Sequence, residues 1–158
     1  MMNRVAVLAQ EVPLPVWRKK AAAFVKKTLA MLNHDNWDVS VLFCGNNFIQ
    51  TLNKKYRGID APTDVLSFNM GESFEEGGGG RRYIAGDIVI SLDTLCENAR
   101  AFDVIEDEEL RRLLVHGILH LAGYDHIVND ISAAAQKKSA MIFLQEEILQ
   151  SLTKERII

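Results

Sequence analysis

Residues 116–126 read His116-Gly-Ile-Leu-His120-Leu-Ala-Gly123-Tyr-Asp-His126, so three of the four histidines in the chain fall in this one stretch. On an α-helix, residues four apart are separated by about 40° around the axis and about 6 Å along it. His116 and His120 are therefore predicted to project from one face of a helix, where both imidazoles can bind the same cation.

His126 requires that this helix end before it. In a continued helix, His126 would lie about 120° around the axis from His120 and would point away from a shared ion. The helix is predicted to end at Gly123, because glycine readily takes the left-handed conformation found just after a helix C-terminus. We predict a turn at Gly123 that brings His126 back to the other two histidines.

Three neutral imidazoles with one open position are typical of a catalytic zinc site, whereas structural zinc sites are closed by four protein ligands that usually include Cys. No Cys lies near this stretch. We therefore predict one Zn²⁺ per chain, held by His116, His120 and His126. Nickel, copper and cobalt stay open as alternatives, because three imidazoles also accept those ions.

The same stretch keeps the three histidines and the glycine of the metzincin protease motif H-E-x-x-H-x-x-G-x-x-H. Gly117 stands where that motif has its glutamate. The predicted metal ligands therefore resemble those of a protease. The general base of the protease is missing, because glycine has no side chain that can accept a proton.

The composition is that of an ordinary globular protein. The 158 residues, 48% hydrophobic and 25% charged, suit a single domain over residues 1–158. No apolar run approaches the ~18 residues needed to cross a bilayer, and no signal-peptide pattern is present, so we expect a cytoplasmic protein without membrane contact. Cys44 and Cys96 are most simply two buried thiols, with a disulfide as the minor alternative.

The net charge of −3 argues against a protein that grips nucleic acid with its whole surface, but a local basic site remains possible. Lys54-Lys55-Tyr56-Arg57 is one compact cationic cluster. Arg81-Arg82 is a second, and for it a solvated surface is the simpler interpretation.

The rest of the chain is predicted to form strands and helices around the histidine stretch. Strands are expected at Asn3–Ala9, Trp37–Cys44, about 64–68 and Ile84–Ser91. Helices are expected at Val16–Leu32, from Asn46 as N-cap to about Tyr56, at 92–102, from about Ile105 through the histidines, and at 131–152.

The acids at 106–109 suit a helix N-terminus and are interpreted as structural. Gly71 to Arg82 is predicted to be a flexible loop between two strands. The expected fold is α+β, with about five helices packed on one side of a small mixed four-stranded sheet.

The histidine stretch resembles the signature H-G-x-L-H-L-x-G-Y-D-H of the bacterial YbeY endoribonucleases at every fixed position. Leu52-Asn-Lys-Lys-Tyr-Arg57 and Pro62-Thr-Asp-Val-Leu-Ser-Phe68 look like a second signature of that family. Gly86-Asp87-Ile88 and the segment Met141–Leu149 are similar to further parts of it.

The resemblance implies a zinc-dependent endoribonuclease specific for single strands. It would act on the rRNA of the small ribosomal subunit, with single-stranded RNA and ribosomal material as partners. It also assigns a role to Arg57, which sequence alone would interpret as a surface residue ending a helix. A guanidinium is always charged and offers a planar fork of donors, so Arg57 can anchor a phosphodiester. Asp64 and Ser67 are interpreted as structural, and Asp87 is left unassigned.

Two other functions stay open on the sequence. A zincin-like metalloprotease would use the same three histidine ligands with a carboxylate base. A non-catalytic, zinc-stapled ribosome-binding module would bind zinc only to stabilise its fold. The oligomeric state, the cleavage site, any general base and the choice between water and the RNA 2′-hydroxyl as nucleophile are not encoded in any pattern we recognise.

Overall fold

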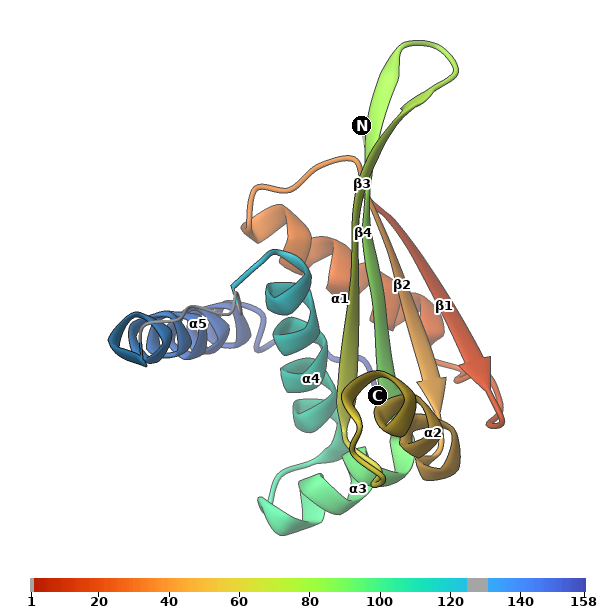
Figure 1. The fold of residues 1–158 in the computed structure, drawn as a ribbon, viewed down its shortest axis with the longest axis vertical. Helices are drawn as coiled ribbons and strands as arrows, with labels where there is room; N and C mark the ends of the chain where they lie inside the picture. The colour runs from red at the N-terminus through yellow and green to blue at the C-terminus, as the bar shows by residue number, and fades with distance from the viewer. Residues whose placement is uncertain (1, 125–130) are drawn as a thin grey trace.

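The structure, a computed structural model, describes residues 2–124 and 131–158, with the backbone alone over 131–139. Strands and helices alternate through the first half of the chain, and helices alone form the last part (Figure 1). In chain order the elements are β1 (Arg4–Gln10), α1 (Arg18–Met31), β2 (Trp37–Cys44), α2 (Asn46–Arg57), β3 (Val65–Glu76), β4 (Gly80–Ser91), α3 (Leu92–Ala101), α4 (Glu106–Leu121) and α5 (Ile131–Ser151).

The four strands form one mixed sheet in the order β1-β2-β4-β3. β1, β2 and β4 run parallel, and β3 pairs antiparallel with β4. This confirms the predicted α+β fold with a four-stranded mixed sheet and five helices. β3 is an edge strand, so one of its sides carries main-chain groups that are not paired with another strand of the described residues.

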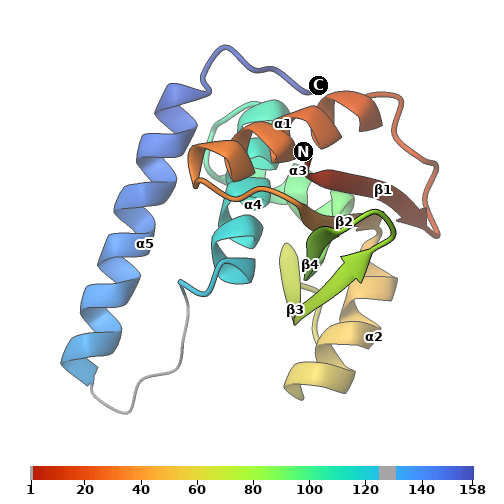
Figure 2. The same ribbon diagram turned by 90° about the horizontal axis from the view of Figure 1, so that it is seen from above.

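Helices cover both faces of the sheet, which corrects the prediction that they lie on one side. The inward residues of β2, such as Val41 and Phe43, belong to the main core together with α1 and α4. α2 lies on the opposite side of the sheet from α1 (Figure 2), where Ile49 packs with Leu66 and Val89 in a second cluster. The central strand β4 is apolar on both faces, so a helix on each side is needed to bury it.

The start of α2 also differs from the prediction by one residue. Gly45, not Asn46, is the N-cap, and Asn46 is the first helical residue. The Asn46 side chain is used elsewhere: its Oδ1 accepts hydrogen bonds from Ser91 Oγ at 2.7 Å and Thr94 Oγ1 at 2.6 Å. It therefore ties the start of α2 to the junction of β4 and α3.

Residues 71–82 form the outer part of a hairpin rather than the predicted loop. β3 and β4 stay paired from Glu72 opposite Ile84 to Glu76 opposite Gly80, and a short turn joins them. A bulge lies between the two parts of the ladder, since Asn69 pairs with Gly86 and the next pair is Glu72 with Ile84. Beyond the bulge the pairing continues to the turn despite the glycine-rich composition.

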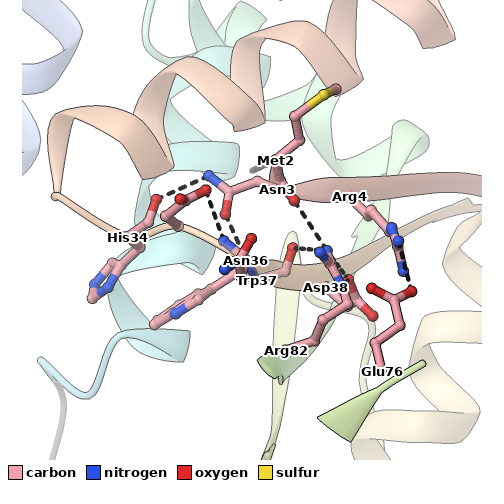
Figure 3. A network of polar contacts seen from close by, with 10 residues as sticks. Met2, Asn3, Arg4, His34, Asn36, Trp37, Asp38, Glu76 and Arg82 are labelled. Carbon is pink, nitrogen blue, oxygen red and sulfur yellow. Dashed lines mark hydrogen bonds and ion pairs between the residues drawn. The ribbon is translucent and has the colours of Figure 1, made fainter. Parts of the chain in front are cut away.

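A polar network fixes the base of this hairpin to the sheet (Figure 3). Arg82 is 4% exposed, and its Nε donates to Asp38 Oδ1 at 2.9 Å while its Nη2 donates to the Met2 carbonyl at 3.1 Å. Arg4 pairs with Glu76 at 2.7 Å. Arg82 is therefore a structural residue and not part of a solvated cationic surface. His34, two residues after the C-cap of α1, stacks on Trp37 with ring centroids 3.9 Å apart.

α4 is the central helix of the molecule. Its apolar residues include Leu110, Leu113, Leu114, Ile118 and Leu119, all with 0% exposure. It packs between the sheet and α5, so its last turn holds a fixed position beside β3 (Figure 1). Within residues 2–124 and 131–158, no helix is long and apolar enough to cross a bilayer.

Candidate active site

The last turn of α4 ends as the sequence predicted. Gly123 has φ +91°, and its N–H donates to the His120 carbonyl at 3.0 Å. The Tyr124 N–H reaches back to the Leu119 carbonyl at 3.1 Å. These two bonds form a Schellman motif, in which a residue with positive φ ends the helix and satisfies its last carbonyls. The chain therefore turns sharply just after the two histidines.

His116 and His120 lie together on one face of α4. Their Nε2 atoms are 2.7 Å apart, and the Nδ1 of His116 lies 3.0 Å from Gln145 Oε1 on α5. An amide oxygen only accepts, so the proton of a neutral His116 resides on Nδ1 and leaves Nε2 as a lone pair. His120 Nε2 then donates to it when no cation lies between them.

The surroundings of His116 favour its neutral form. Burial lowers the pKa of His116 below its usual value, and the neighbouring His120 lowers it further. A neutral imidazole is the form that binds metal ions, so the same burial that disfavours protonation prepares His116 as a ligand.

Arg57 meets the histidines across the edge of the sheet. It is the last residue of α2, which Gly58 ends in the left-handed conformation. Arg57, His116 and His120 line one cavity of about 360 Å³ together with the start of β3 and the turn before it, at Thr63, Asp64, Val65, Leu66 and Ser67. The guanidinium is held from within its own helix by Asn53 Oδ1, which accepts from Nη1 at 3.4 Å. Arg57 and the histidine pair, 59 residues apart in sequence, therefore share one pocket.

Asp64 is fixed at the wall of this pocket. Its Oδ2 accepts from Asn98 Nδ2 at 3.1 Å and lies 3.5 Å from Arg112 Nη2, while its Oδ1 accepts from the Val65 N–H at 2.8 Å. Arg112 also pairs with Glu109, whose pKa burial raises. The Asp64 carboxylate is thus already held by an amide, a main-chain N–H and a cation.

His126 lies outside the described residues, as does Asp125, so the structure does not test the third ligand. Among residues 2–124 and 131–158, no group of three His, Cys, Asp or Glu side chains is arranged to hold a metal ion. Cys44 and Cys96 are free thiols, and neither lines the pocket. The described part of the site is therefore a pair of histidines facing one arginine.

Sequence reasoning missed two residues that position the site, Asn53 and Gln145. It interpreted Asp64 and Ser67 as structural, and both line the pocket. A signal existed for Asn53 and Gln145. Gln145 follows Met141 by four residues on the buried stripe of α5 and is 7% exposed, and Asn53 follows Ile49 in the same way and is 2% exposed. A polar residue on the apolar face of a helix needs a hydrogen-bonding partner, so it indicates a constrained position.

Together, the fold and the pocket define a small α+β protein whose site joins a histidine pair to an arginine. A sequence model of the family described as Endoribonuclease YbeY matches residues 7–153. The chain belongs to this family, as its sequence signatures predicted.

Curated relatives agree over nearly the whole chain. The Endoribonuclease YbeY of Treponema denticola is 47% identical over 94% of this chain and 93% of its own length. That of Borreliella afzelii is 44% identical over 80% of this chain and 81% of its own. The solution structure of TM1509 from Thermotoga maritima is 30% identical and superposes with a TM-score of 0.51, covering 95% of this chain and 92% of that one.

Proposed function

We propose that the chain is a zinc-dependent endoribonuclease that cleaves single-stranded RNA and acts on the rRNA of the small ribosomal subunit. The observation that carries the proposal is the meeting of two imidazoles and a permanently charged arginine in one pocket of a chain that belongs to an endoribonuclease family. The proposal includes the ribosomal small subunit as partner and the cytoplasm as location.

The histidine pair fits a metal ion. Both Nε2 atoms point to one position, and Gln145 fixes the tautomer that leaves the His116 Nε2 lone pair available. His116, His120 and, by its sequence position, His126 would hold the ion. When bound, a divalent metal supplies Lewis-acid charge at a phosphoryl oxygen and lowers the pKa of water to about 7.

The remaining chemistry belongs to the chain's own residues. Arg57 binds the scissile phosphodiester and neutralises the charge that develops on its oxygens, because a guanidinium cannot lose its proton at any working pH. Lys54 and Lys55 lie in the turn of α2 just before it and add positive charge along an approaching strand. An unpaired strand fits an open pocket at a sheet edge because its backbone is accessible and flexible.

The two alternative functions are less well supported. A metalloprotease needs a carboxylate base where Gly117 stands, and Gly117 is buried against Ile88 with no room for a side chain. Among the described pocket residues the only carboxylate is Asp64, which Arg112 and Asn98 already hold. A non-catalytic zinc-stapled module would not need Arg57 in the pocket, and the curated relatives named above are endoribonucleases.

The test combines metal analysis of the purified protein with cleavage of unpaired RNA, with and without a chelator. We expect one zinc per chain, cleavage that stops on chelation, and recovery when zinc is restored. His116→Ala should abolish cleavage while RNA binding is mostly kept. His34→Ala is the matched control, because His34 lies at the end of α1 and stacks on Trp37.

Other outcomes would favour the alternatives. RNA binding without any metal-dependent cleavage would support the ribosome-binding module. Cleavage of casein but not of RNA would support the protease. Mass analysis of the RNA ends identifies the nucleophile, because a 2′,3′-cyclic phosphate would exclude water as the first attacking group.

A further inference from the structure

The outward edge of β3 borders the active-site pocket. β3 is the last strand of the sheet, and Val65, Leu66 and Ser67 line the cavity that also contains His116 and Arg57. α4 brings the histidines to one side of this edge, and α2 brings Arg57 from the opposite face of the sheet. The main chain of an edge strand therefore lies between the two groups to which the reaction is assigned.

The register of β3 and β4 determines which main-chain groups face the pocket. In an antiparallel ladder, alternate residues direct both N–H and C=O toward the partner strand. The Ser91 N–H donates to the Asp64 carbonyl at 3.0 Å, so Asp64 faces β4, and with it Leu66 and Phe68. An added Cβ on Gly86 would meet the Phe68 carbonyl oxygen at 2.0 Å, which independently directs that carbonyl toward β4.

Val65 and Ser67 consequently direct their N–H and C=O groups away from β4. For Val65, the outward N–H is already used, because it donates to the Asp64 carboxylate at 2.8 Å. The Ser67 N–H is the next donor along the same edge, about 7 Å further on, and Ser67 is one of the residues that line the pocket.

We infer that the main-chain N–H of Ser67 binds a non-bridging oxygen of the scissile phosphodiester, as a second donor beside Arg57. This inference rests on the proposed endoribonuclease function. A main-chain N–H is held rigidly by the strand and needs no reorganisation as charge develops on the phosphate. The Ser67 carbonyl faces the same way and matches the ribose hydroxyls, which are donors that alternate with phosphates along an RNA strand.

The experiment compares Ser67→Pro with Ser67→Ala. Alanine removes the hydroxyl and keeps the N–H, whereas proline removes the N–H as well. Proline is tolerated on an edge strand where the N–H does not bond to the neighbouring strand, so Ser67→Pro is expected to fold. Leu66→Pro is the control for orientation, because it removes an N–H that faces β4 and should lower the unfolding midpoint in urea. The readouts are kcat for cleavage of a single-stranded RNA, its KM, and the unfolding midpoint.

We expect Ser67→Pro to lose about 10²-fold in kcat relative to Ser67→Ala, the loss seen when one preorganised hydrogen-bond donor to a developing charge is removed. A folded Ser67→Pro variant whose kcat stays within about threefold of Ser67→Ala would overturn the inference. If Ser67→Pro does not fold, a chain with lactic acid at position 67 replaces it, because the ester oxygen takes the place of the N–H and leaves the alanine side chain. The kcat of this chain is compared with that of Ser67→Ala, and the same two results support or overturn the inference. A wild type without cleavage would instead overturn the proposed function, so the two failures are distinguishable.

Discussion

Two buried polar side chains position the groups to which catalysis is assigned. Gln145 holds His116 from α5, and Asn53 holds Arg57 from one turn earlier in α2. Asn53 also donates from Nδ2 to the Ala61 carbonyl at 2.9 Å, which ties the turn after α2 to the helix. Neither side chain needs to touch the substrate to influence the reaction, because each restricts where its partner can lie.

Replacing Asn53 by Ala should weaken both stability and cleavage. The Ala61 carbonyl loses its donor and Arg57 loses its acceptor, so we expect the free energy of unfolding to fall by about 1–3 kcal/mol. kcat should fall because the guanidinium is no longer held in the pocket. Urea unfolding and RNA cleavage measure the two effects. Gln50→Ala is the control, since Gln50 lies on the same helix and its side chain donates an exposed hydrogen bond to Asp60. A variant with wild-type kcat would show that Asn53 does not position Arg57.

The two cysteines should differ in reactivity. Cys44 has 0% exposure, and burial raises the pKa of its thiol to about 11, so at pH 8 only about one thiol in a thousand is ionised. Burial also raises the pKa of Cys96, but its side chain is partly exposed. Iodoacetamide at pH 8 should therefore add one label to the folded chain and two after unfolding in urea, as read by mass spectrometry. Raising the pH toward 11 should speed the modification of both thiols. Labelling that survives Cys96→Ser in the folded chain would contradict this assignment.

At the scale of elements, the contact of α4 with the sheet is close at Gly117. A Cβ at that position would meet Ile88 Cγ2 at 2.8 Å and its Cγ1 and Cδ1 at 3.1 Å. Gly117 thus lets α4 approach β4 closely, which holds the histidines at the level of the β3 edge. The glutamate of the metzincin motif is therefore absent from position 117 for a packing reason, because a side chain there would collide with Ile88.

The close approach predicts that Gly117→Ala destabilises the wild type but stabilises a variant in which Ile88 is replaced by alanine. Gly117→Ala in the wild type should lower the free energy of unfolding by about 1–3 kcal/mol, because the added methyl group overpacks against Ile88. In an Ile88→Ala background the same substitution should stabilise the protein by up to about 1 kcal/mol, because alanine is the better helix former and the space is now free. Urea unfolding of the four proteins measures the coupling. Equal effects of Gly117→Ala in both backgrounds would exclude the contact as its cause.

At the scale of the whole molecule, Asp107 joins the end of the chain to the start of α4. It is 2% exposed, and its Oδ1 accepts from the Ile157 N–H at 2.6 Å and the Ile158 N–H at 2.9 Å. Its Oδ2 pairs with Arg111 Nε at 2.9 Å, and Arg111 Nη1 donates to the Leu152 carbonyl at 3.4 Å. The acid at this helix start is structural, as predicted, but it binds the C-terminal segment in addition to favouring the helix dipole.

Asp107→Ala should lower the free energy of unfolding by about 3–5 kcal/mol, because it leaves the partly buried Arg111 without its partner and two main-chain donors without an acceptor. Thermal and urea unfolding measure the loss. Glu108→Ala is the matched control, since Glu108 is exposed in the same turn and should change stability little. A loss no larger than that of the control would mean that the C-terminal segment contributes little to the fold.

The local features of this protein could be predicted from its amino-acid sequence. The pairing of His116 with His120 and the helix end at Gly123 follow from helix geometry and glycine conformation, and the strands and helices follow from periodicity, because all of these depend on neighbours within a few residues. Only the tertiary structure decided that α2 crosses to the other face of the sheet, that Arg57 reaches the histidines around the edge of β3, and that Asp64 and Ser67 line the same pocket. Those contacts depend on strand order and register, which are set by how all the apolar faces pack together and not by any short segment.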